Sequence, residues 1–178
     1  MRLFHFSDDP TIEVFTPRPV RTPAERPPGR EWLNGPLVWA IEEDWQAMYL
    51  FPRDCPRILL RQTAATTDAD RDHWWGDRAS RWIAHMEWAW FERLRAATAY
   101  RYHLPVAPFE NLGDAGMWVA REAVEPLGMD AITDLPAALA AQGAELRLMH
   151  SLVPLKDVWD HSFHASGIRL RNAQGWNG

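Results

Sequence analysis

A histidine and a hydroxyl two residues apart, His5 and Ser7, lie in an apolar segment near the start of the sequence. Side chains alternate between the faces of a β-strand, so these two residues would share one face while Phe4 and Phe6 share the other. The two phenylalanines would anchor the strand in a core and leave an imidazole beside a hydroxyl on the opposite surface. Such a polar pair is typical of a strand that lines a binding cleft. The alternative is a structural strand whose histidine is satisfied inside the protein.

Two aromatic residues further along the sequence could complete a cleft of this kind. Trp39 lies in the wholly apolar run 37–41, which predicts a buried strand. Tyr49 lies in segment 42–51, where acidic residues come first and apolar residues recur at helical spacing, so a short helix is expected. Aromatic faces bind planar ligands, but aromatic residues at helical spacing are also common in cores.

The single cysteine, Cys55, lies between Arg53 and Arg57 in a stretch rich in proline. Neighbouring arginines can lower the pKa of a thiol and make it a nucleophile. The position after a helix favours instead a small buried residue. One cysteine excludes a disulfide within the sequence and fits a reducing compartment, so a cytoplasmic location is expected.

The seven histidines raise the question of a metal site. His161 and His164 are three residues apart, with acidic residues nearby, yet no spacing matches a zinc-protease helix or a zinc finger. We therefore predict no bound metal. No glycine-rich phosphate loop of the common types is present in the sequence.

Length and composition indicate one domain, residues 1–178, large enough to bury a core. A net charge of −5 argues against broad binding to nucleic acid and leaves only a local basic cleft for it. No apolar run is long enough to span a membrane, and no membrane partner is expected. Eleven tryptophans are unusual and supply both core volume and stacking surfaces.

The order of the expected elements indicates an α+β fold with a curved, mixed and largely antiparallel sheet. One long helix is expected over 77–97, where apolar residues recur at helical spacing. Segment 17–36 holds six prolines and four arginines and predicts an extended surface loop. The other expected strands cover 57–61, 99–104, 117–122, 129–132 and 144–149. Residues 12–15 form a short apolar element, and shorter helices follow Thr67 and Asp134.

Three segments, 2–8, 37–50 and 116–126, together resemble the ADP-ribosyltransferase-like fold, in their order and in the elements that carry them. The resemblance implies a split-barrel sheet and a binding site for NAD. It implies that His5 and Ser7 hold the adenosine ribose. The whole chain also resembles a small bacterial family of unknown function, for which no activity is implied.

The same resemblance implies roles for the aromatic and basic residues. Trp39 and Tyr49 would stack on the two faces of the nicotinamide, a cationic ring that aromatic faces bind well. Arg53 and Arg57 would neutralise the charge of the pyrophosphate.

The third segment departs from the pattern of the transferases that modify proteins. Met117 stands where those enzymes carry a catalytic glutamate, and the RNA 2′-phosphotransferase branch of the fold also lacks that residue. Glu122 or Glu110 could supply a carboxylate from elsewhere. The catalytic candidates are therefore His5 and Glu122.

The function expected from the sequence is binding of NAD or ADP-ribose, with transfer of an ADP-ribosyl group as the associated reaction and no acceptor identified. A non-catalytic module that binds a nucleotide or a nucleic-acid end is the first alternative. A structural or interaction domain without a small-molecule ligand is the second.

Overall fold

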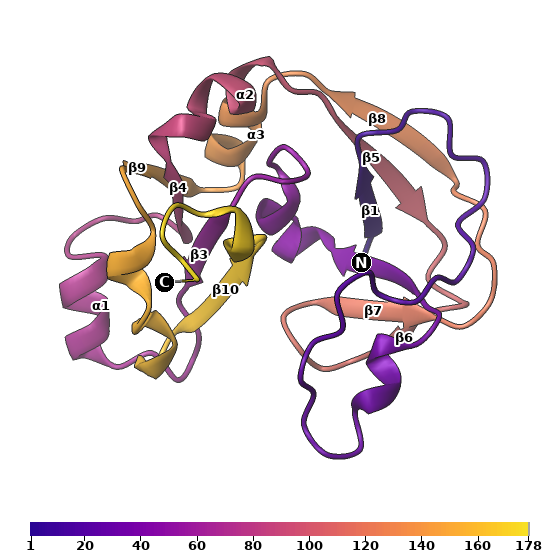
Figure 1. Ribbon diagram of the computed structural model, residues 1–178, viewed down its shortest axis with the longest axis horizontal. Helices are drawn as coiled ribbons and strands as arrows, with labels where there is room; N and C mark the ends of the chain where they lie inside the picture. The colour runs from indigo at the N-terminus through magenta and orange to yellow at the C-terminus, as the bar shows by residue number, and fades with distance from the viewer. Residues whose placement is uncertain (178) are drawn as a thin grey trace. The chain divides into compact units, whose positions relative to one another are not determined.

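A computed structural model describes residues 1–177 (Figure 1). By its internal contacts the chain divides into two compact units. The first unit comprises residues 1–46 and 100–131, and the second comprises residues 47–99 and 132 onward. The α+β class and the largely antiparallel pairing expected from the sequence are confirmed, but the strands form two sheets and not one. The assignment of residues 1–178 to a single domain stays a prediction.

The first sheet has six strands in the order β6-β7-β2-β1-β5-β8. Their bounds are β1 Leu3–Ser7, β2 Val38–Glu42, β5 Ala99–Leu104, β6 Glu110–Asn111, β7 Met117–Ala120 and β8 Gly128–Ile132. β1 lies at the centre of the sheet and pairs antiparallel with both β2 and β5. One apolar cluster on this sheet includes Leu3, Phe15 and Tyr102, and a second includes Leu37 and Val119.

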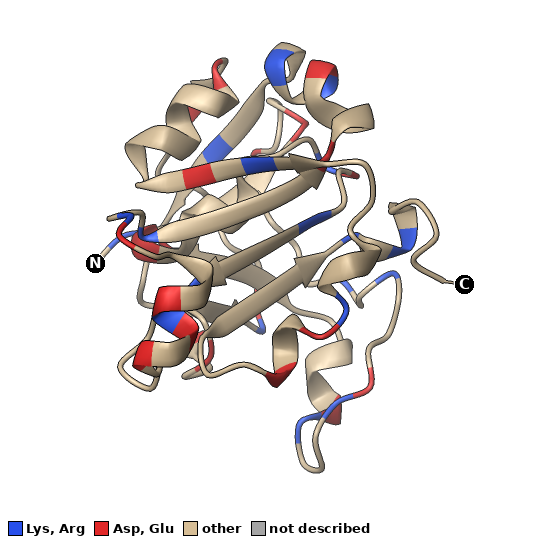
Figure 2. Cartoon of the chain, turned by 90° about the vertical axis from the view of Figure 1, so that its left-hand side faces the viewer, with Lys and Arg blue, Asp and Glu red and all other residues tan. Residues whose placement is uncertain are grey.

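The second sheet has four strands in the order β10-β3-β4-β9. Their bounds are β3 Arg57–Arg61, β4 Trp82–Glu87, β9 Ala144–Met149 and β10 His164–Ile168. β4 pairs antiparallel with β3 and parallel with β9. All six residues of β4 are buried, which is typical of a central strand covered on both faces. β3 carries an arginine at each end and β9 carries Glu145 and Arg147, and Figure 2 shows charged residues on these strands as well as on helices and loops.

The helices are short. The α-helices are α1 Asp68–Trp74, α2 Phe91–Ala96 and α3 Leu135–Ala141, and the 3₁₀ helices are η1 Glu31–Asn34, η2 Glu43–Tyr49, η3 Trp88–Trp90, η4 Val153–Leu155, η5 Val158–Asp160 and η6 Leu170–Asn172. As expected, α1 and α3 begin at Thr67 and Asp134, whose side chains accept hydrogen bonds from main-chain N–H groups of the first turn. None of the helices in residues 1–177 has the length and apolar character needed to cross a membrane.

The prediction of one long helix over 77–97 is wrong. This segment contains the strand β4, the single turn η3 and the six-residue helix α2. A strand buried on both faces carries apolar residues on both of them, so a helical period can be found in it by choosing every third or fourth residue. The helical spacing of Ile83 and Met86 therefore reflected burial in a strand.

The arginine- and proline-rich segment 17–36 is largely irregular, as expected, but it has two regular features that the sequence did not predict. It contains the 3₁₀ helix η1, and Arg18 forms an isolated bridge with Leu37. The Arg30 guanidinium donates to the main-chain oxygen of Leu112. These contacts hold the segment against the rest of the first unit.

Candidate functional site

His5 lies where two central strands stop pairing. β1 pairs with β2 only at Leu3 and Phe4, whereas it pairs with β5 as far as Ser7. Beyond Phe4, the imidazole Nδ1 of His5 lies 2.8 Å from the main-chain oxygen of Trp39. A carbonyl oxygen only accepts, so Nδ1 carries a hydrogen, and in the neutral form of the ring Nε2 is then an acceptor. The structure therefore brings the His5 ring to the main chain of Trp39. The Trp39 side chain lies on the opposite face of the sheet, because Leu3 pairs with Glu42 and Phe4 with Ile41.

The face of β1 that carries His5 is not the open polar surface expected from the sequence. Leu3 on the same face is buried, and the His5 ring centroid lies 4.6 Å from that of Phe15. Phe4, on the other face, is buried as predicted, beneath the guanidinium of Arg101 at 4.7 Å. The sheet is packed on both faces here, so His5 lies half-buried at the rim of an apolar cluster.

Ser7 shares the face of His5 and ends the strand. Its hydroxyl oxygen accepts a hydrogen bond of 3.1 Å from the main-chain N–H of Asp9. The Asp9 carboxylate accepts in turn from Thr11. These are the local bonds of a turn, and they hold the Ser7 hydroxyl at the end of β1.

Trp39 is partly buried against the apolar cluster that includes Leu33 and Leu37. The guanidinium carbon of Arg26 lies 5.9 Å from the centroid of its ring. The indole Nε1 is buried and has no hydrogen-bond partner among the residues described. A buried N–H without an acceptor is costly, and a ligand oxygen could satisfy it.

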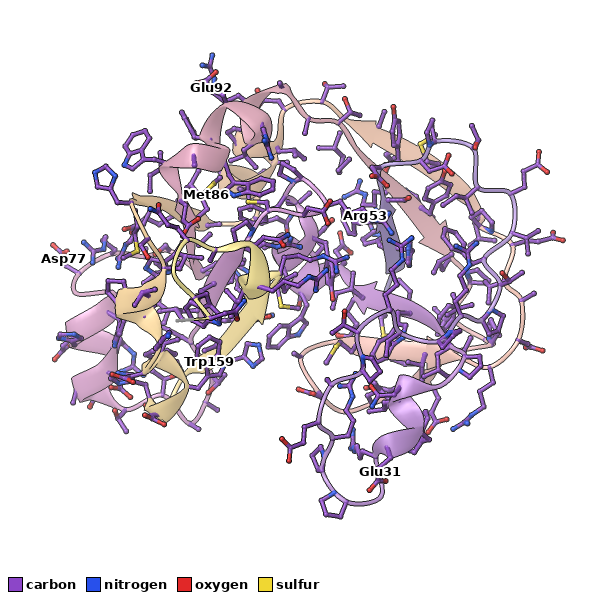
Figure 3. All side chains as sticks on the ribbon, viewed as in Figure 1. Glu31, Arg53, Asp77, Met86, Glu92 and Trp159 are labelled. Carbon is purple, nitrogen blue, oxygen red and sulfur yellow. The ribbon has the colours of Figure 1, made fainter. Side chains whose placement is uncertain are left out.

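Tyr49, Arg53 and Arg57 belong to the second unit, whereas His5 and Trp39 belong to the first. Tyr49 is partly buried, and this burial raises the pKa of its hydroxyl. Arg53, which is labelled in Figure 3, is exposed, and its main-chain oxygen accepts from the Arg169 guanidinium. A stack of Trp39 and Tyr49 on one ring stays a prediction.

Arg57 is buried, with 3% of its surface exposed. Its guanidinium donates to the main-chain oxygen of Met48 at 2.9 and 3.1 Å and to that of Cys55 at 2.9 Å. Its guanidinium carbon also lies 5.3 Å from the ring centroid of Phe51. Burial lowers the pKa of Arg57 to about 10, so the group stays charged at neutral pH. These contacts fix the segment before β3 and direct the guanidinium toward the protein interior.

Cys55 is buried, and burial raises the pKa of its thiol to about 12. Arg57 acts in the opposite direction and is outweighed. The Sγ atom lies 3.5 Å from the main-chain oxygen of Pro56. The structure therefore favours the buried, unreactive residue of the two alternatives considered for this cysteine.

Glu122 is exposed and lines an open cavity of about 530 Å³. The same cavity is lined by Glu125 and by a proline-rich turn at 105–108. Met117, at the first position of β7, is partly buried and packs against the apolar cluster of Leu37 and Val119. Glu110 lies 3.8 Å from the Arg121 guanidinium. Glu122 therefore has the exposure that a catalytic carboxylate needs, and its role stays a prediction.

His161, one of the two histidines considered for metal binding, is hydrogen-bonded within the protein. His161 Nδ1 lies 2.9 Å from the carboxylate of Asp70, which also accepts from the Ser162 hydroxyl and main chain. These hydrogen bonds, those of Ser162 first, lower the pKa of Asp70. Within residues 1–177, no three histidine, cysteine or acidic side chains are grouped as a metal site requires.

The structure reveals a His–Asp pair that the sequence did not indicate. His103 Nε2 lies 2.7 Å from Asp130 Oδ2, and Arg101 donates to the same oxygen at 2.7 Å. Hydrogen bonds from Arg101 and then His103 lower the pKa of Asp130. Both members of the pair line a cavity of about 490 Å³. The only sequence signal for the His103–Asp130 pair is a polar residue in each of two expected strands. The sequence did not predict that these two strands are neighbours.

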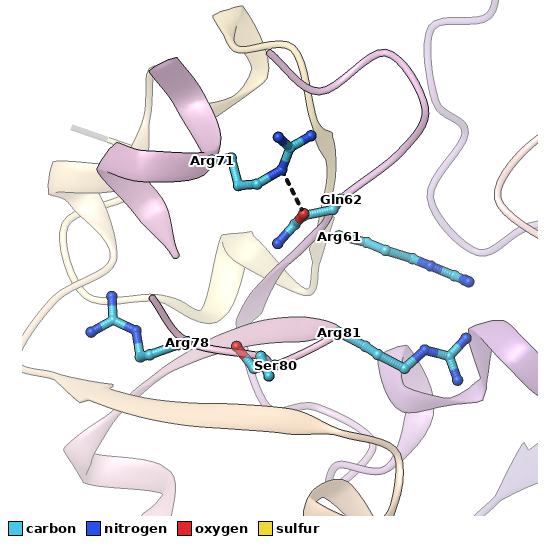
Figure 4. Close-up of a pocket in the computed structure, with 7 residues that line it drawn as sticks. Arg61, Gln62, Arg71, Arg78, Ser80 and Arg81 are labelled. Carbon is cyan, nitrogen blue, oxygen red and sulfur yellow. Dashed lines mark hydrogen bonds between the residues drawn. The ribbon is translucent and has the colours of Figure 1, made fainter. Parts of the chain in front are cut away.

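The second unit contains another cavity that the sequence did not predict. It is lined mainly by arginines (Figure 4). Its residues come from the end of β3, from α1 and from the connection that follows α1. The expected helix over 77–97 covered part of that connection. For this reason the sequence did not indicate that Arg78 and Arg81 lie close to Arg61 and Arg71.

A family model described as "Family of unknown function (DUF6886)" matches residues 4–173. The chain therefore belongs to this family, and the expectation of a family of unknown function is confirmed. No curated protein and no solved structure matches the chain.

Proposed function

We propose that the first unit binds NAD or ADP-ribose at the place where β1 and β2 diverge. The observation that supports this proposal is the bond between His5 Nδ1 and the main-chain oxygen of Trp39. It occurs beyond the last β1–β2 pair at Phe4, inside the central strands of a sheet. A side chain that bridges two diverging strands is held in one orientation, as a group that recognises a ligand must be.

The chemistry of these residues fits a nucleotide ligand. With Nδ1 donating to a carbonyl, His5 Nε2 can accept a hydrogen bond from a ribose hydroxyl. The Trp39 indole lies on the opposite face of the sheet, so its buried Nε1–H is a donor outside this site. The half-buried position of His5 would exclude part of the surrounding water and strengthen such bonds.

The associated reaction is transfer of the ADP-ribosyl group. The glycosidic bond of NAD breaks, nicotinamide leaves, and a nucleophilic oxygen of the acceptor forms the new bond to the ribose carbon. The carboxylate of Glu122, in its exposed position, would take the proton of that acceptor. The split-barrel fold, the bacterial origin and the cytoplasmic location implied by the sequence belong to the same proposal.

The binding experiment is a calorimetric titration of the whole chain with ADP-ribose and with NAD. We expect saturable binding that His5→Ala reduces at least tenfold and that Trp39→Phe, a change on the opposite face of the sheet, leaves unchanged. His150→Ala, at an exposed histidine of the second unit, is the matched control and should bind as the wild type does. Absence of saturable heat with both ligands, in a folded protein, would refute the proposal.

A second assay separates a transferase from a binding module. Release of nicotinamide from NAD, lost in Glu122→Gln, would establish turnover. Binding of ADP-ribose without nicotinamide release would favour the non-catalytic nucleotide-binding module.

A further inference from the structure

The arginine-lined cavity of the second unit has a volume of about 470 Å³. Its walls comprise Arg61, Gln62, Arg71, Arg78, Ala79, Ser80 and Arg81. These seven lining residues include four guanidinium groups and not one carboxylate. In Figure 4 the side chains of Arg61 and Arg81 extend to the right and that of Arg78 to the left, with Ser80 between Arg78 and Arg81 and Gln62 below Arg71. Such a concentration of positive charge around one space predicts an anionic ligand.

The guanidinium of Arg71 is held in place by the protein. Its Nε donates to Gln62 Oε1 at 3.2 Å, and its Nη2 donates to the main-chain oxygen of Thr66 at 3.2 Å. Its Nη1 pairs with Asp68, whose side chain is 91% exposed. An ion pair this exposed is weak, so an anion in the cavity can compete for Arg71.

Arg78 shares its acidic partner with another arginine. Its Nε lies 3.2 Å from one carboxylate oxygen of Glu145, and Arg147 donates to the other oxygen at 2.7 Å. One carboxylate thus faces two guanidinium groups at this end of the cavity. The Arg78 guanidinium also donates to the main-chain oxygen of Trp74, which limits its motion.

Two neutral groups add hydrogen-bonding capacity. Because Gln62 Oε1 accepts from Arg71, the amide nitrogen of Gln62 is left as a donor of two hydrogens. The Ser80 hydroxyl is buried and has no hydrogen-bond partner within the described part of the chain. A buried hydroxyl without a partner is costly, and an oxygen of a bound ligand would remove that cost.

We propose that this cavity binds a phosphorylated small molecule, a phosphate ester or a diphosphate. Phosphate oxygens would accept from Arg71 and Arg78, in the planar geometry that guanidinium groups provide, and from Ser80 and Gln62. The volume lies in the range of small-molecule pockets and leaves room for the group esterified to the phosphate. This inference concerns the second unit and does not depend on the binding of NAD or ADP-ribose in the first.

The test is a calorimetric titration of the whole chain with inorganic pyrophosphate and inorganic phosphate. We expect one saturable pyrophosphate site that weakens as salt is added. Gln62→Glu keeps the size of the side chain and the acceptor for Arg71 but adds a negative charge to the wall. It should weaken binding at least tenfold, and Ser80→Ala should weaken it several-fold. Gln174→Glu makes the same change of net charge on an exposed side chain and should leave binding unchanged.

Thermal unfolding of each variant establishes that it is folded, and pyrophosphate should raise the Tm of the wild type but not of Gln62→Glu. The proposal is wrong if the wild type shows no saturable binding. It is also wrong if Gln174→Glu loses as much affinity as Gln62→Glu, since net charge would then explain the effect. His5→Ala should retain pyrophosphate binding, which distinguishes this site from the one in the first unit.

Discussion

Gly116 lies against the indole of Trp45, so closely that a Cβ atom at Gly116 would be 2.3 Å from Trp45 Cδ1. Its φ angle of +68° is also in the left-handed region that favours glycine. Gly116 precedes β7 and its main-chain oxygen accepts from the N–H of Glu42 at the end of β2. The glycine is therefore required by packing and backbone geometry, and it sets where β7 begins beside β2.

We expect Gly116→Ala to lower the free energy of unfolding much more than Gly113→Ala. Gly113 has a similar φ of +65° but nothing within 4 Å of an added Cβ, so its substitution should cost only the backbone strain, about 1–2 kcal/mol. Gly116→Ala should cost about 1–3 kcal/mol more because of the overlap with Trp45. Urea unfolding of the two variants measures this difference, and equal losses would show that the indole can move aside.

Arg57→Met should destabilise the protein by about 2 kcal/mol. The main-chain oxygens of Met48 and Cys55 would lose their buried hydrogen-bond donors. Removing the buried charge recovers part of the free energy of unfolding, but less than the loss of these hydrogen bonds costs. Arg171→Met, at an exposed arginine of the same unit, should change stability by less than about 0.5 kcal/mol. The urea midpoints of the two variants test this assignment. An Arg57→Met protein as stable as the wild type would show that the guanidinium is not structural.

The buried His85 should make stability fall as the pH drops from about 6.5 toward 4. Burial, and next the charge of Arg147, lowers its pKa from 6.5 to about 4. In that window the unfolded chain binds a proton that the folded chain does not, so the contribution is fully present above pH 6.5 and is lost on acidification. Between pH 7 and 5 the loss from this one group is about 2 kcal/mol.

The free energy of unfolding measured at pH 7, 6 and 5 should therefore fall less steeply in His85→Phe than in the wild type. The exposed His150, replaced by alanine, should keep the wild-type slope. If wild type and His85→Phe lose stability in parallel, protonation of another group dominates this pH range.

Cys55 should not react with a thiol reagent such as dithionitrobenzoate while the protein is folded. Its burial and a pKa of about 12 leave almost no thiolate at neutral pH. Addition of urea beyond the unfolding midpoint should release one equivalent of reactive thiol. Rapid reaction of the native protein would instead support the nucleophile that the flanking arginines suggested.

Local patterns in the sequence predicted several elements well. The strands at 57–61, 99–104 and 144–149 have the bounds expected. Each is a short run of residues that favour a β-strand, bounded on both sides by residues that end one. The capping side chains of Thr67 and Asp134 marked their helices. The segment containing β4 was misassigned, because a strand buried on both faces carries no alternation. The strand β10 in the C-terminal part was not predicted at all.

The candidate site was harder to predict, because it depends on which strands are neighbours. The sequence indicated His5 and Trp39 separately, and only the strand order brings the ring of one to the main chain of the other. The His103–Asp130 pair was missed for the same reason. Burial also separates residues that look alike in sequence, since Arg53 is exposed while Arg57 is enclosed.

The measurement that tests the central claim most directly is an NMR titration of the histidine ring nitrogens with ADP-ribose, the His5 signals being assigned by their loss in His5→Gln. The free protein should show a hydrogen on Nδ1 of His5, as the bond to the Trp39 oxygen requires. The His5 signals should move progressively and saturate as ADP-ribose is added, while those of the exposed His150 stay in place. Unchanged His5 signals at saturating ADP-ribose would contradict a nucleotide site at the divergence of β1 and β2.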